Sequence, residues 1–384
     1  MTKAPPRGFQ AAEFEARCAR AQALMAEAGL AALLLTREPE LRYYTGFLTR
    51  FRESPTRPWF LVLPAVGAPI AVIPAIGAHL MRQTWVRDIR SWVAPDYTDD
   101  GIGLLAGTLR EVVPAGERIG VAHHLESHLH MPLEGFARLT ASLGARRIVD
   151  DARITARLRA IKSPAEIDRI AATIAVATRA FDRVPEIAAP GVPLSEVFRR
   201  FQMHCLEEGA DWVPYLAGAA GPDGYFDVIS PATDAPLAPG DVLMLDTGAI
   251  RDGYFCDFDR NYAVGPPSAP VVEAQARLVE AVQAGFEAAK PGARFCDLHT
   301  AMEEIVRLGP GAGRLGHGLG MELTEGPSII SADLTVLAPG MVLTLEPVVM
   351  LAGGRLIVHE EDIVIEEDGA RFLTRAEGPE MRVI

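Results

Sequence analysis

Hydrophobic and polar positions alternate between helical and strand spacing through the first 150 residues of the chain. The segment EFEARCARAQALMAEAG, residues 13–29, repeats its apolar residues at helical spacing and ends at a glycine. The apolar run AALLL follows directly, and it has the length of a buried strand. A helix that leads into a strand in this way is typical of an α/β domain, and we expect one here.

The longest uncharged run of the chain lies in the same region. WFLVLPAVGAPIAVIPAIGAHLM, residues 59–81, is long enough to cross a bilayer as a helix. Pro64, Pro69 and Pro74 would each interrupt that helix, because proline lacks a backbone N–H and clashes with the preceding turn. We therefore expect two short strands joined by a turn.

A well-marked helix start indicates where a second domain begins. In KSPAEIDRIAATIAVATRAF, residues 162–181, Ser163 and Glu166 form a capping box with proline at the first helical position, and isoleucines recur at helical spacing. We place the domain boundary just before this helix. The prediction is an N-terminal domain of residues 1–155 and a C-terminal domain of residues 156–384.

The second domain contains an internal repeat. LAPGDVLMLD at residues 237–246 matches LAPGMVLTLE at residues 337–346 in seven of ten positions, one hundred residues apart. Upstream, APGVPLSEVFRRF at residues 189–201 parallels KPGARFCDLHTAM at residues 290–302, each with a Pro-Gly turn that leads into a helix. The repeat predicts two similar α/β halves.

Each half has a strand that ends in a carboxylate and a second strand that carries another. These carboxylates are Asp246 and Asp257 in the first half, and Glu346 and Glu361 in the second. A pseudo-two-fold relation between the halves would bring all four together at the interface between them. Because desolvation and repulsion oppose ionisation, four buried carboxylates need compensating cations, and two divalent ions would balance their charge.

One histidine has a setting that suits a metal site. His317 stands in RLGHGLGMELTEG, where flanking glycines allow the backbone to approach a ligand or metal closely. One imidazole with four carboxylates forms a mostly oxygen-donor site, which suits Mn²⁺, Fe²⁺, Co²⁺ or Zn²⁺ better than a metal selected by thiolates. Two such ions, roughly 3.5–4 Å apart, can share a hydroxide and polarise a carbonyl group.

Composition narrows the choice of partners. The formal charge of −13 argues against a nucleic acid or an anionic membrane surface, because both require a basic face. The four cysteines lie far apart without a CxxC pair, so neither a disulfide framework nor a thiolate zinc site is indicated. The first residues, MTKAPPRGFQ, lack the apolar core of a signal peptide, and we expect a cytoplasmic protein.

The order and spacing of the candidate ligands resemble the five-ligand signature of the pita-bread metallopeptidase family, which includes prolidase, aminopeptidase P and methionine aminopeptidase. The residues that carry the resemblance are Asp246, Asp257 eleven residues later, His317 in GHGLG, Glu346 in TLEP and Glu361 in the Glu-Asp pair before IVI. With an N-terminal α/β domain followed by KSPAEI, the whole chain resembles the creatinase/prolidase layout. The resemblance implies an α+β fold, in which a creatinase-like α/β domain precedes a pita-bread domain with a pseudo-two-fold repeat.

The resemblance also implies a role for each ligand. Asp246 would bind one metal through two oxygens, Asp257 and Glu361 would bridge both metals, and His317 and Glu346 would complete the other. Glu346 would act as the general base as well. The implied activity is that of a dinuclear hydrolase similar to Xaa-Pro dipeptidase or aminopeptidase P. In such an enzyme a hydroxide bridging two divalent ions, with Mn²⁺ favoured over Co²⁺, Fe²⁺ or Zn²⁺, attacks an amide carbonyl.

Two substrate-binding histidines that this family usually carries have no counterpart in the chain. One usually lies in a Pro-His pair before the first aspartate strand, where this sequence reads GPDGYFDVISPATD. The other lies seven residues after the metal-binding histidine, where this chain has Thr324. Either Tyr225, Asp227 or Thr324 substitutes for these histidines, or the substrate differs from a peptide.

The chain also departs from the family next to Asp257. The usual Asp-x-Thr-Arg-Thr becomes DFDRN, which places Asp259 and Arg260 after Asp257. Strand alternation puts Asp259 on the same side as Asp257, so that it can support the metal ligands or act as an extra one. A structural salt bridge between Asp259 and Arg260 is the alternative.

These departures leave other reactions open on the same scaffold. One is hydrolysis of a small non-peptide metabolite, such as an amide or amidine. Another is a lyase reaction, in which a carboxylate acts as the base. A binding protein without metal is disfavoured by the complete set of ligands.

Two segments of the N-terminal domain suggest further sites. TRFRESPTRPWF gathers Arg50, Arg52, Arg57 and Trp59 in a polar loop. Creatinase-like relatives are dimers in which one subunit's N-terminal domain approaches the other's active site, so we expect a homodimer whose loop reads an anionic substrate; a solvated loop is the alternative. HHLESHLH, residues 123–130, resembles a zinc motif but lacks the His-Glu-x-x-His order, and we expect an exposed helix start there.

Overall fold

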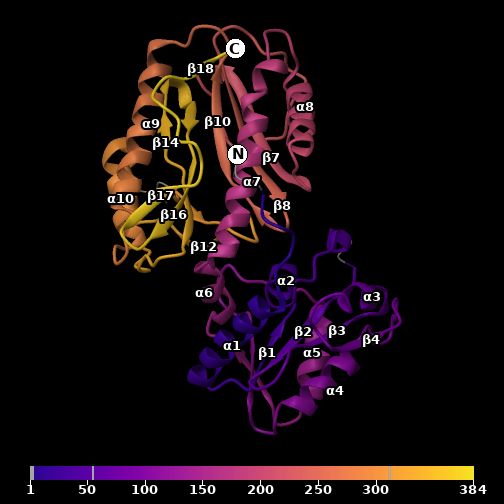
Figure 1. Cartoon of the computed structure of the whole chain (residues 1–384). Coiled ribbons are helices and arrows are strands. Elements are labelled where there is room, and N and C mark those ends of the chain that lie inside the picture. The colour runs from indigo at the N-terminus through magenta and orange to yellow at the C-terminus, as the bar shows by residue number, and fades with distance from the viewer. Residues whose placement is uncertain (1–3, 54–55, 310, 312) are drawn as a thin grey trace. The chain divides into compact units, whose positions relative to one another are not determined.

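The computed structural model describes residues 4–53, 56–309, 311 and 313–384. The chain divides into two compact units, one of residues 7–159 and one of residues 160–384 together with residues 4–6. The boundary predicted after residue 155 falls inside helix α6 (Ile154–Ala160). Figure 1 shows both units, and each is described by itself below.

The N-terminal unit is built on a six-stranded mixed sheet with the order β4-β3-β2-β1-β5-β6. Its strands are β1 (Ala32–Leu35), β2 (Phe60–Pro64), β3 (Ile70–Pro74), β4 (Asp88–Trp92), β5 (Arg118–Val121) and β6 (Arg147–Asp150). Its helices are α1 (Ala11–Ala28), α2 (Glu38–Thr45), α3 (Ala78–Met81), α4 (Ile102–Val112), α5 (Leu133–Ser142) and α6, with 3-10 turns η1 (Arg50–Glu53) and η2 (Ala75–Gly77). The predicted α/β character is confirmed.

The apolar run at residues 59–81 forms two strands, followed by the 3-10 turn η2 and the four-residue helix α3. Strands β2 and β3 pair in antiparallel register within this run, and both are buried throughout their length. Across the described residues, no helix has both the length and the apolar character needed to span a bilayer. The prediction of two strands joined by a turn is therefore confirmed.

The C-terminal unit contains two five-stranded groups and a hairpin. The first group has the order β18-β10-β8-β7, with β9 paired to β8, and the second has the order β12-β11-β13-β16-β17. The strands are β7 (Trp212–Pro222), β8 (Asp241–Arg251), β9 (Tyr254–Phe255), β10 (Phe258–Ala263), β11 (His317–Gly318), β12 (Glu325–Ser328), β13 (Val342–Leu345), β14 (Val348–Met350), β15 (Leu356–Val358), β16 (Glu361–Glu366), β17 (Gly369–Phe372) and β18 (Arg382–Val383). Strands β14 and β15 form the hairpin.

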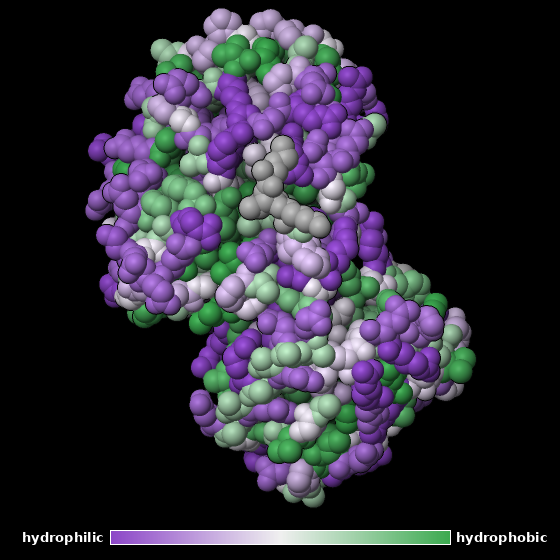
Figure 2. All heavy atoms as spheres, in the orientation of Figure 1, coloured by the Kyte–Doolittle hydropathy of each residue, from purple (hydrophilic) through white to green (hydrophobic). Residues whose placement is uncertain are grey.

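Helices cover the two groups of strands separately. They are α7 (Pro164–Asp182), α8 (Leu194–Glu207), α9 (Ala269–Ala288) and α10 (Phe295–Val306), with 3-10 turns η3 (Val184–Glu186) and η4 (Ala352–Gly354). Helices α7 and α8 pack on β8 and β7, whereas α9 packs on α10 and on strands of the second group (Figure 1). Figure 2 shows hydrophilic and hydrophobic side chains interspersed over the visible surface of this unit, as expected of a surface in contact with water.

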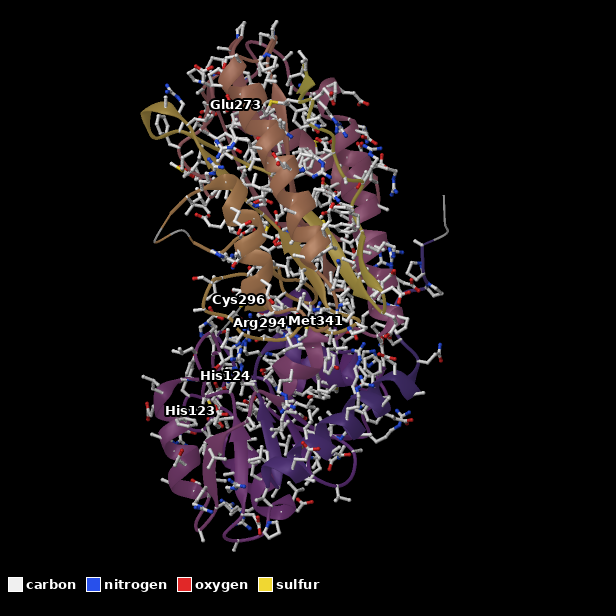
Figure 3. All side chains as sticks on the ribbon, turned by 90° about the vertical axis from the view of Figure 1, so that its left-hand side faces the viewer. His123, His124, Glu273, Arg294, Cys296 and Met341 are labelled. Carbon is white, nitrogen blue, oxygen red and sulfur yellow. The ribbon has the colours of Figure 1, made fainter. Side chains whose placement is uncertain are left out.

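The internal repeat of the sequence recurs in the backbone hydrogen bonds. In each half, the Pro-Gly turn bonds to the Leu-Ala-Pro-Gly segment, and the glycine of that segment bonds to the end of the partner strand. The matching donor and acceptor pairs are Gly191–Leu237 with Gly292–Leu337, and Gly240–Val264 with Gly340–Ile365. Equivalent positions thus differ by 100 residues between β8 and β13, and by 101 residues between β10 and β16. Figure 3 labels Arg294 and Cys296 at the start of α10, the second-half counterpart of the start of α8.

The predicted capping box opens helix α7. The Ser163 hydroxyl accepts a hydrogen bond from the Glu166 backbone N–H at 3.3 Å, and the Glu166 carboxylate accepts one from the Ser163 N–H at 3.0 Å. Two backbone donors that a helix start leaves unpaired are satisfied in this way.

Replacement of Ser163 by alanine removes the side-chain acceptor for the Glu166 N–H, which keeps its bond to the backbone carbonyl of residue 163 at 2.9 Å. We expect Ser163→Ala to lower the free energy of unfolding of the C-terminal unit by about 1 kcal/mol, measured by equilibrium urea denaturation. Ser195 bonds the exposed carboxylate of Asp234 and serves as the control, since Ser195→Ala should change stability by less than about 0.5 kcal/mol. Equal effects of the two substitutions would contradict the capping role.

Candidate metal centre

Two pairs of antiparallel strands carry the candidate ligands. In the first half, β8 and β10 pair so that Asp246 lies directly across from Asp259. In the second half, β13 and β16 place Leu345 across from Glu361, and the His359 N–H bonds to the Pro347 carbonyl one step beyond. Continuation of this register puts the residue after Leu345, Glu346, across from Glu360.

Three side chains offer ligand atoms that lie close enough for one cation to contact them all. The atoms belong to Asp257, His317 and Glu360, lie within 4.8 Å of one another, and come from three buried residues. His317 Nε2 lies 3.4 Å from Asp257 Oδ2 and 3.6 Å from Glu346 Oε2. The carboxylate of Asp246 is close enough to Asp257 for its negative charge to raise the pKa of that residue, and its Oδ2 accepts a hydrogen bond from the Tyr215 hydroxyl at 3.1 Å.

Local geometry gives His317 one free nitrogen that faces the carboxylates. Its Nδ1 lies 2.9 Å from the Gly318 carbonyl, which can only accept, so Nδ1 carries the proton and Nε2 keeps its lone pair. Burial lowers the pKa of His317 and favours this neutral form. The preceding Gly316 has φ +147°, and a Cβ there would stand 2.2 Å from the Thr344 carbonyl, so only glycine allows this close approach to β13.

Three carboxylates of this centre, those of Asp246, Asp257 and Glu360, are difficult to ionise without cations. Burial, followed by the negative charge of Glu346, raises the pKa of Asp246 to about 7. Burial and then neighbouring carboxylates also raise the pKa of Asp257 and of Glu360 well above their usual range. Asp246 Oδ1 and Glu360 Oε1 are buried and have no hydrogen-bond partner. An oxygen-rich donor set with orphaned oxygens and one free imidazole nitrogen fits divalent cations well.

The structure corrects the prediction for Glu361 by one residue. Glu361 is fully buried, but its Oε2 accepts a hydrogen bond from Arg260 at 2.9 Å and its Oε1 accepts one from the Glu377 N–H at 3.0 Å. Although burial alone would raise it, Arg260 above all, together with His359 and Thr374, lowers the pKa of Glu361 to about 2. Glu360 occupies the place in the cluster that we had expected for Glu361.

Strand alternation is the physical reason for this correction. Alternate residues of a strand point to opposite faces, so Glu361 shares a face with Ile363 and Ile365, which belong to the apolar core. Glu360 points to the other face, toward the ligands. The apolar residues at positions 363 and 365 are the sequence signal for this orientation, because they mark the face that Glu361 shares.

Two of the predicted catalytic positions, Arg260 and Tyr225, are buried. Arg260 pairs with Glu361 and its Nε lies 3.3 Å from Glu377, so its positive charge compensates these two carboxylates next to the cluster. The Tyr225 hydroxyl bonds to Asn261 and to the Val358 N–H. Arg260 also donates to the backbone carbonyl of Glu360 at 3.0 Å, whereas the bonds of the Tyr225 hydroxyl go to residues outside the cluster. These contacts favour a positioning role for both residues over direct contact with a substrate.

Two further positions were expected to replace the missing histidines. The Asp227 carboxylate accepts from the N–H groups of Ile229 and Ser230 and from the Ser230 hydroxyl, so it closes its own turn. Thr324 is exposed, and its hydroxyl lies 3.4 Å from an Arg314 nitrogen. Of the three proposed substitutes, Thr324 is therefore the one that remains available to a substrate.

Arg314 is a site residue that the sequence did not single out. Its Nε donates to Glu346 Oε1 at 3.2 Å, while 38% of its side chain stays exposed. Arg314 thus contacts both Glu346, beside the cluster, and the exposed Thr324. Its position three residues before His317 was the available signal, but a lone arginine in a loop has many structural explanations.

A second group of possible ligands lies in the N-terminal unit. His124 Nδ1 stands 3.6 Å from Asp151 and 3.9 Å from Asp150, at the ends of parallel strands β5 and β6; His123 and His124 are labelled in Figure 3. Burial raises the pKa of Asp151 to about 6. His128, a later histidine of the same HHLESHLH segment, is not part of this group. The expected helix start is absent too, because the described segment 122–132 contains no helix.

The arginine-rich loop of the N-terminal unit is only partly described. Arg50 pairs with Glu53 in an exposed 3-10 turn, whereas Trp59 is buried against Phe47 at a ring-centroid distance of 5.5 Å. Residues 54 and 55, together with the side chain of Arg52, lie outside the description. Whether this loop reads an anionic substrate in a homodimer stays a prediction.

Comparison with known proteins identifies relatives along the whole chain. Metallopeptidase family M24 matches residues 168–367, and the creatinase/prolidase N-terminal domain matches residues 17–161. The probable dipeptidase PepE of Mycobacterium tuberculosis is 30% identical over 373 residues, which make up 95% of each chain. The Xaa-Pro dipeptidase of Pyrococcus furiosus is 32% identical over 229 residues, 57% of this chain and 64% of the relative.

Solved structures show the same architecture. Dipeptidase PepE from Mycobacterium ulcerans has a TM-score of 0.84 and 28% identity, covering 98% of this chain and 99% of its own. Prolidase from Thermococcus sibiricus has a TM-score of 0.86 at 24% identity, covers 98% and 100%, and supports the fold alone. The predicted combination of a creatinase-like α/β domain with a pita-bread domain is confirmed.

Glu361, the first residue of β16, and Glu360, which directly precedes it, give a direct test of the corrected site. We expect Glu360→Gln to weaken Mn²⁺ binding by at least about tenfold, because a charged oxygen ligand is lost. Glu361→Gln should leave Mn²⁺ binding unchanged but destabilise the fold by about 2 kcal/mol, because the buried Arg260 loses its charged partner. Binding by equilibrium dialysis and stability by urea denaturation check both. The opposite pattern would restore the original assignment of Glu361.

Proposed function

The chain belongs to metallopeptidase family M24 and is a metallohydrolase, and on that premise we propose that it is a dinuclear dipeptidase. The observation that carries the proposal is the buried group of Asp257, His317 and Glu360, with Glu346 and Asp246 beside it. We propose these five residues as the ligands of two divalent ions, with Mn²⁺ favoured because four of the five donors are carboxylates. Two such ions, when bound, supply Lewis acidity and a water acidic enough to lose its proton near neutral pH.

Residues of the chain itself would orient the substrate and move the proton. Glu346 is divided between two partners, since Oε1 accepts from Arg314 while Oε2 faces His317 at 3.6 Å. Glu346 would therefore have two roles, as a ligand of the ions beside His317 and as the group that takes a proton during attack on the amide carbonyl and passes it to the departing amine. Tyr215 fixes Asp246 through its Oδ2 and leaves Oδ1 unpaired.

A short substrate with a free carboxylate suits the exposed side of the centre. Arg314 presents a partly exposed guanidinium next to Glu346, and Thr324 adds a hydroxyl beside it. A guanidinium and a hydroxyl can bind a carboxylate, as the C-terminal end of a dipeptide would require. The relatives named dipeptidase and Xaa-Pro dipeptidase support this substrate class.

A small non-peptide amide is the second candidate. The observation in its favour is that Asp227 closes its own turn and Tyr225 is buried, which leaves Thr324 alone to replace two substrate-binding groups. For either substrate we propose a homodimer that acts in the cytoplasm. The formal charge of −13 supports the absence of nucleic-acid and anionic-membrane partners.

Removal of the ions tests the proposal as a whole. Dialysis against a chelator should abolish hydrolysis of Xaa-Pro dipeptides, and added Mn²⁺ should restore it, measured by release of the free amine. Asp257→Ala should abolish both metal occupancy and turnover. Full activity of that variant would refute the site. Wild-type protein with two bound ions and no activity on any dipeptide would shift the proposal to the non-peptide amide.

The role of Arg314 predicts a difference between two forms of one substrate. We expect Arg314→Met to raise KM for a dipeptide by about tenfold but to leave KM for the corresponding dipeptide amide nearly unchanged. Only the dipeptide has a C-terminal carboxylate for Arg314 to bind, so only the dipeptide loses an interaction. Arg371, an exposed arginine paired with Glu366, gives the control variant Arg371→Met, which should affect neither substrate. Equal changes in KM for the acid and the amide would show that Arg314 does not read a carboxylate.

A further inference from the structure

Asp259 lies on the ligand-bearing face of its strand. It is the direct cross-strand neighbour of Asp246, and side chains of directly opposed residues in an antiparallel pair project from the same face. Asp257, two residues earlier in the chain, projects from that face by alternation. Three aspartates of the first half therefore point toward the same space.

The internal repeat makes Asp259 the counterpart of a residue that is already in the cluster. Equivalent positions on β10 and β16 differ by 101 residues, as their matching hydrogen bonds show. This offset relates Asp259 to Glu360, and the offset of 100 residues between β8 and β13 relates Asp246 to Glu346. The opposed pair of Asp246 and Asp259 thus repeats the opposed pair of Glu346 and Glu360.

A fixed chain of hydrogen bonds orients one oxygen of Asp259 and leaves the other unpaired. The Tyr225 hydroxyl donates to Asn261 Oδ1 at 3.1 Å, which sets the orientation of that amide. The amide nitrogen then donates to Asp259 Oδ2 at 3.2 Å and to the Val358 carbonyl at 2.6 Å. Asp259 Oδ1 has no hydrogen-bond partner, although the residue is only 1% exposed.

The nearby cationic groups of the chain, Arg260 and His359, make no hydrogen bond to this oxygen. The Arg260 guanidinium is committed to Glu361 and Glu377. His359 holds Glu361 through Nε2 at 3.2 Å, while its Nδ1 stands 3.9 Å from Asp259 Oδ1, beyond hydrogen-bonding distance. A buried carboxylate oxygen without a donor needs a proton or a cation.

From this geometry we infer that Asp259 is a further metal ligand, which binds through Oδ1 the ion held by Asp246. This inference rests on the proposed dinuclear function and extends its ligand set. The centre then contains five carboxylates and one imidazole, with Asp259 and Glu360 at equivalent places in the two halves. The threonine usual at this position in the family resembled by the sequence offers a hydroxyl where this chain offers a full negative charge.

Metal binding by matched variants tests the inference without reference to activity. Asp259→Asn keeps the size of the side chain and removes its charge, and Asp259→Thr introduces the residue usual in the family. We expect each to weaken the binding of one of two Mn²⁺ ions by about 10- to 100-fold, measured as bound metal after equilibrium dialysis against Mn²⁺. Asp252→Asn is the control, because Asp252 is a carboxylate of the same segment that pairs with Arg169. It should bind both ions as the wild type does.

A crystal structure of the wild-type protein with Mn²⁺ separates a ligand from a residue that only positions ligands. We expect Asp259 Oδ1 within about 2.5 Å of the ion beside Asp246, located by anomalous scattering. This measurement needs no variant, so it decides the question even if a substitution impairs folding. An Asp259 oxygen that contacts no ion, or wild-type affinity in Asp259→Asn, would overturn the inference alone. Wild-type protein that binds no Mn²⁺ would overturn the proposed function, and this inference with it.

Discussion

Negative charge buried between two strand pairs is the constraint on which the C-terminal unit depends. Burial and mutual repulsion raise the pKa of Asp257 and Glu360 well above their usual range, and oxygens of Asp246 and Glu360 are left without hydrogen-bond partners. Such a centre is stable only when protons or cations compensate its charge. Under the proposed function, metal binding and the stability of this unit would be coupled, because the same carboxylates that oppose folding when ionised alone would become ligands when cations are present.

The strands next to the site keep two kinds of buried charge apart. On one face, Glu360 turns toward His317 and the other candidate ligands. On the opposite face, Glu361 pairs with Arg260, which brings the pKa of Glu361 to about 2. One carboxylate is thus compensated within the chain, while its sequence neighbour is left for an ion. The period of two in a β-strand is enough to produce this division.

The candidate ligands and the proposed substrate-binding residues lie in different parts of the C-terminal unit. The candidate ligands lie on or next to paired strands, whose register the hydrogen bonds of the repeat fix in both halves. Arg314 and Thr324, by contrast, are exposed or partly exposed loop residues that meet at 3.4 Å. A loop can change its sequence more easily than paired strands can, so such an arrangement allows the substrate to change while the hydrolytic centre stays intact.

The sequence by itself determined the α/β character of the N-terminal unit, the two halves of the C-terminal unit and the chemical class of the site. Helical and strand periods, a hundred-residue repeat and the spacing of His317 and its acidic partners are all visible in the order of residues along the chain. It did not determine which of two adjacent glutamates faces the site, or that Arg314 reaches Glu346. Those outcomes depend on strand register and on contacts between residues distant in the chain. A shift of one residue exchanges the two faces of a strand. Only the tertiary structure, in which Ile363 and Ile365 are buried in the core, decided that Glu361 pairs with Arg260 and that Glu360 faces the ligands.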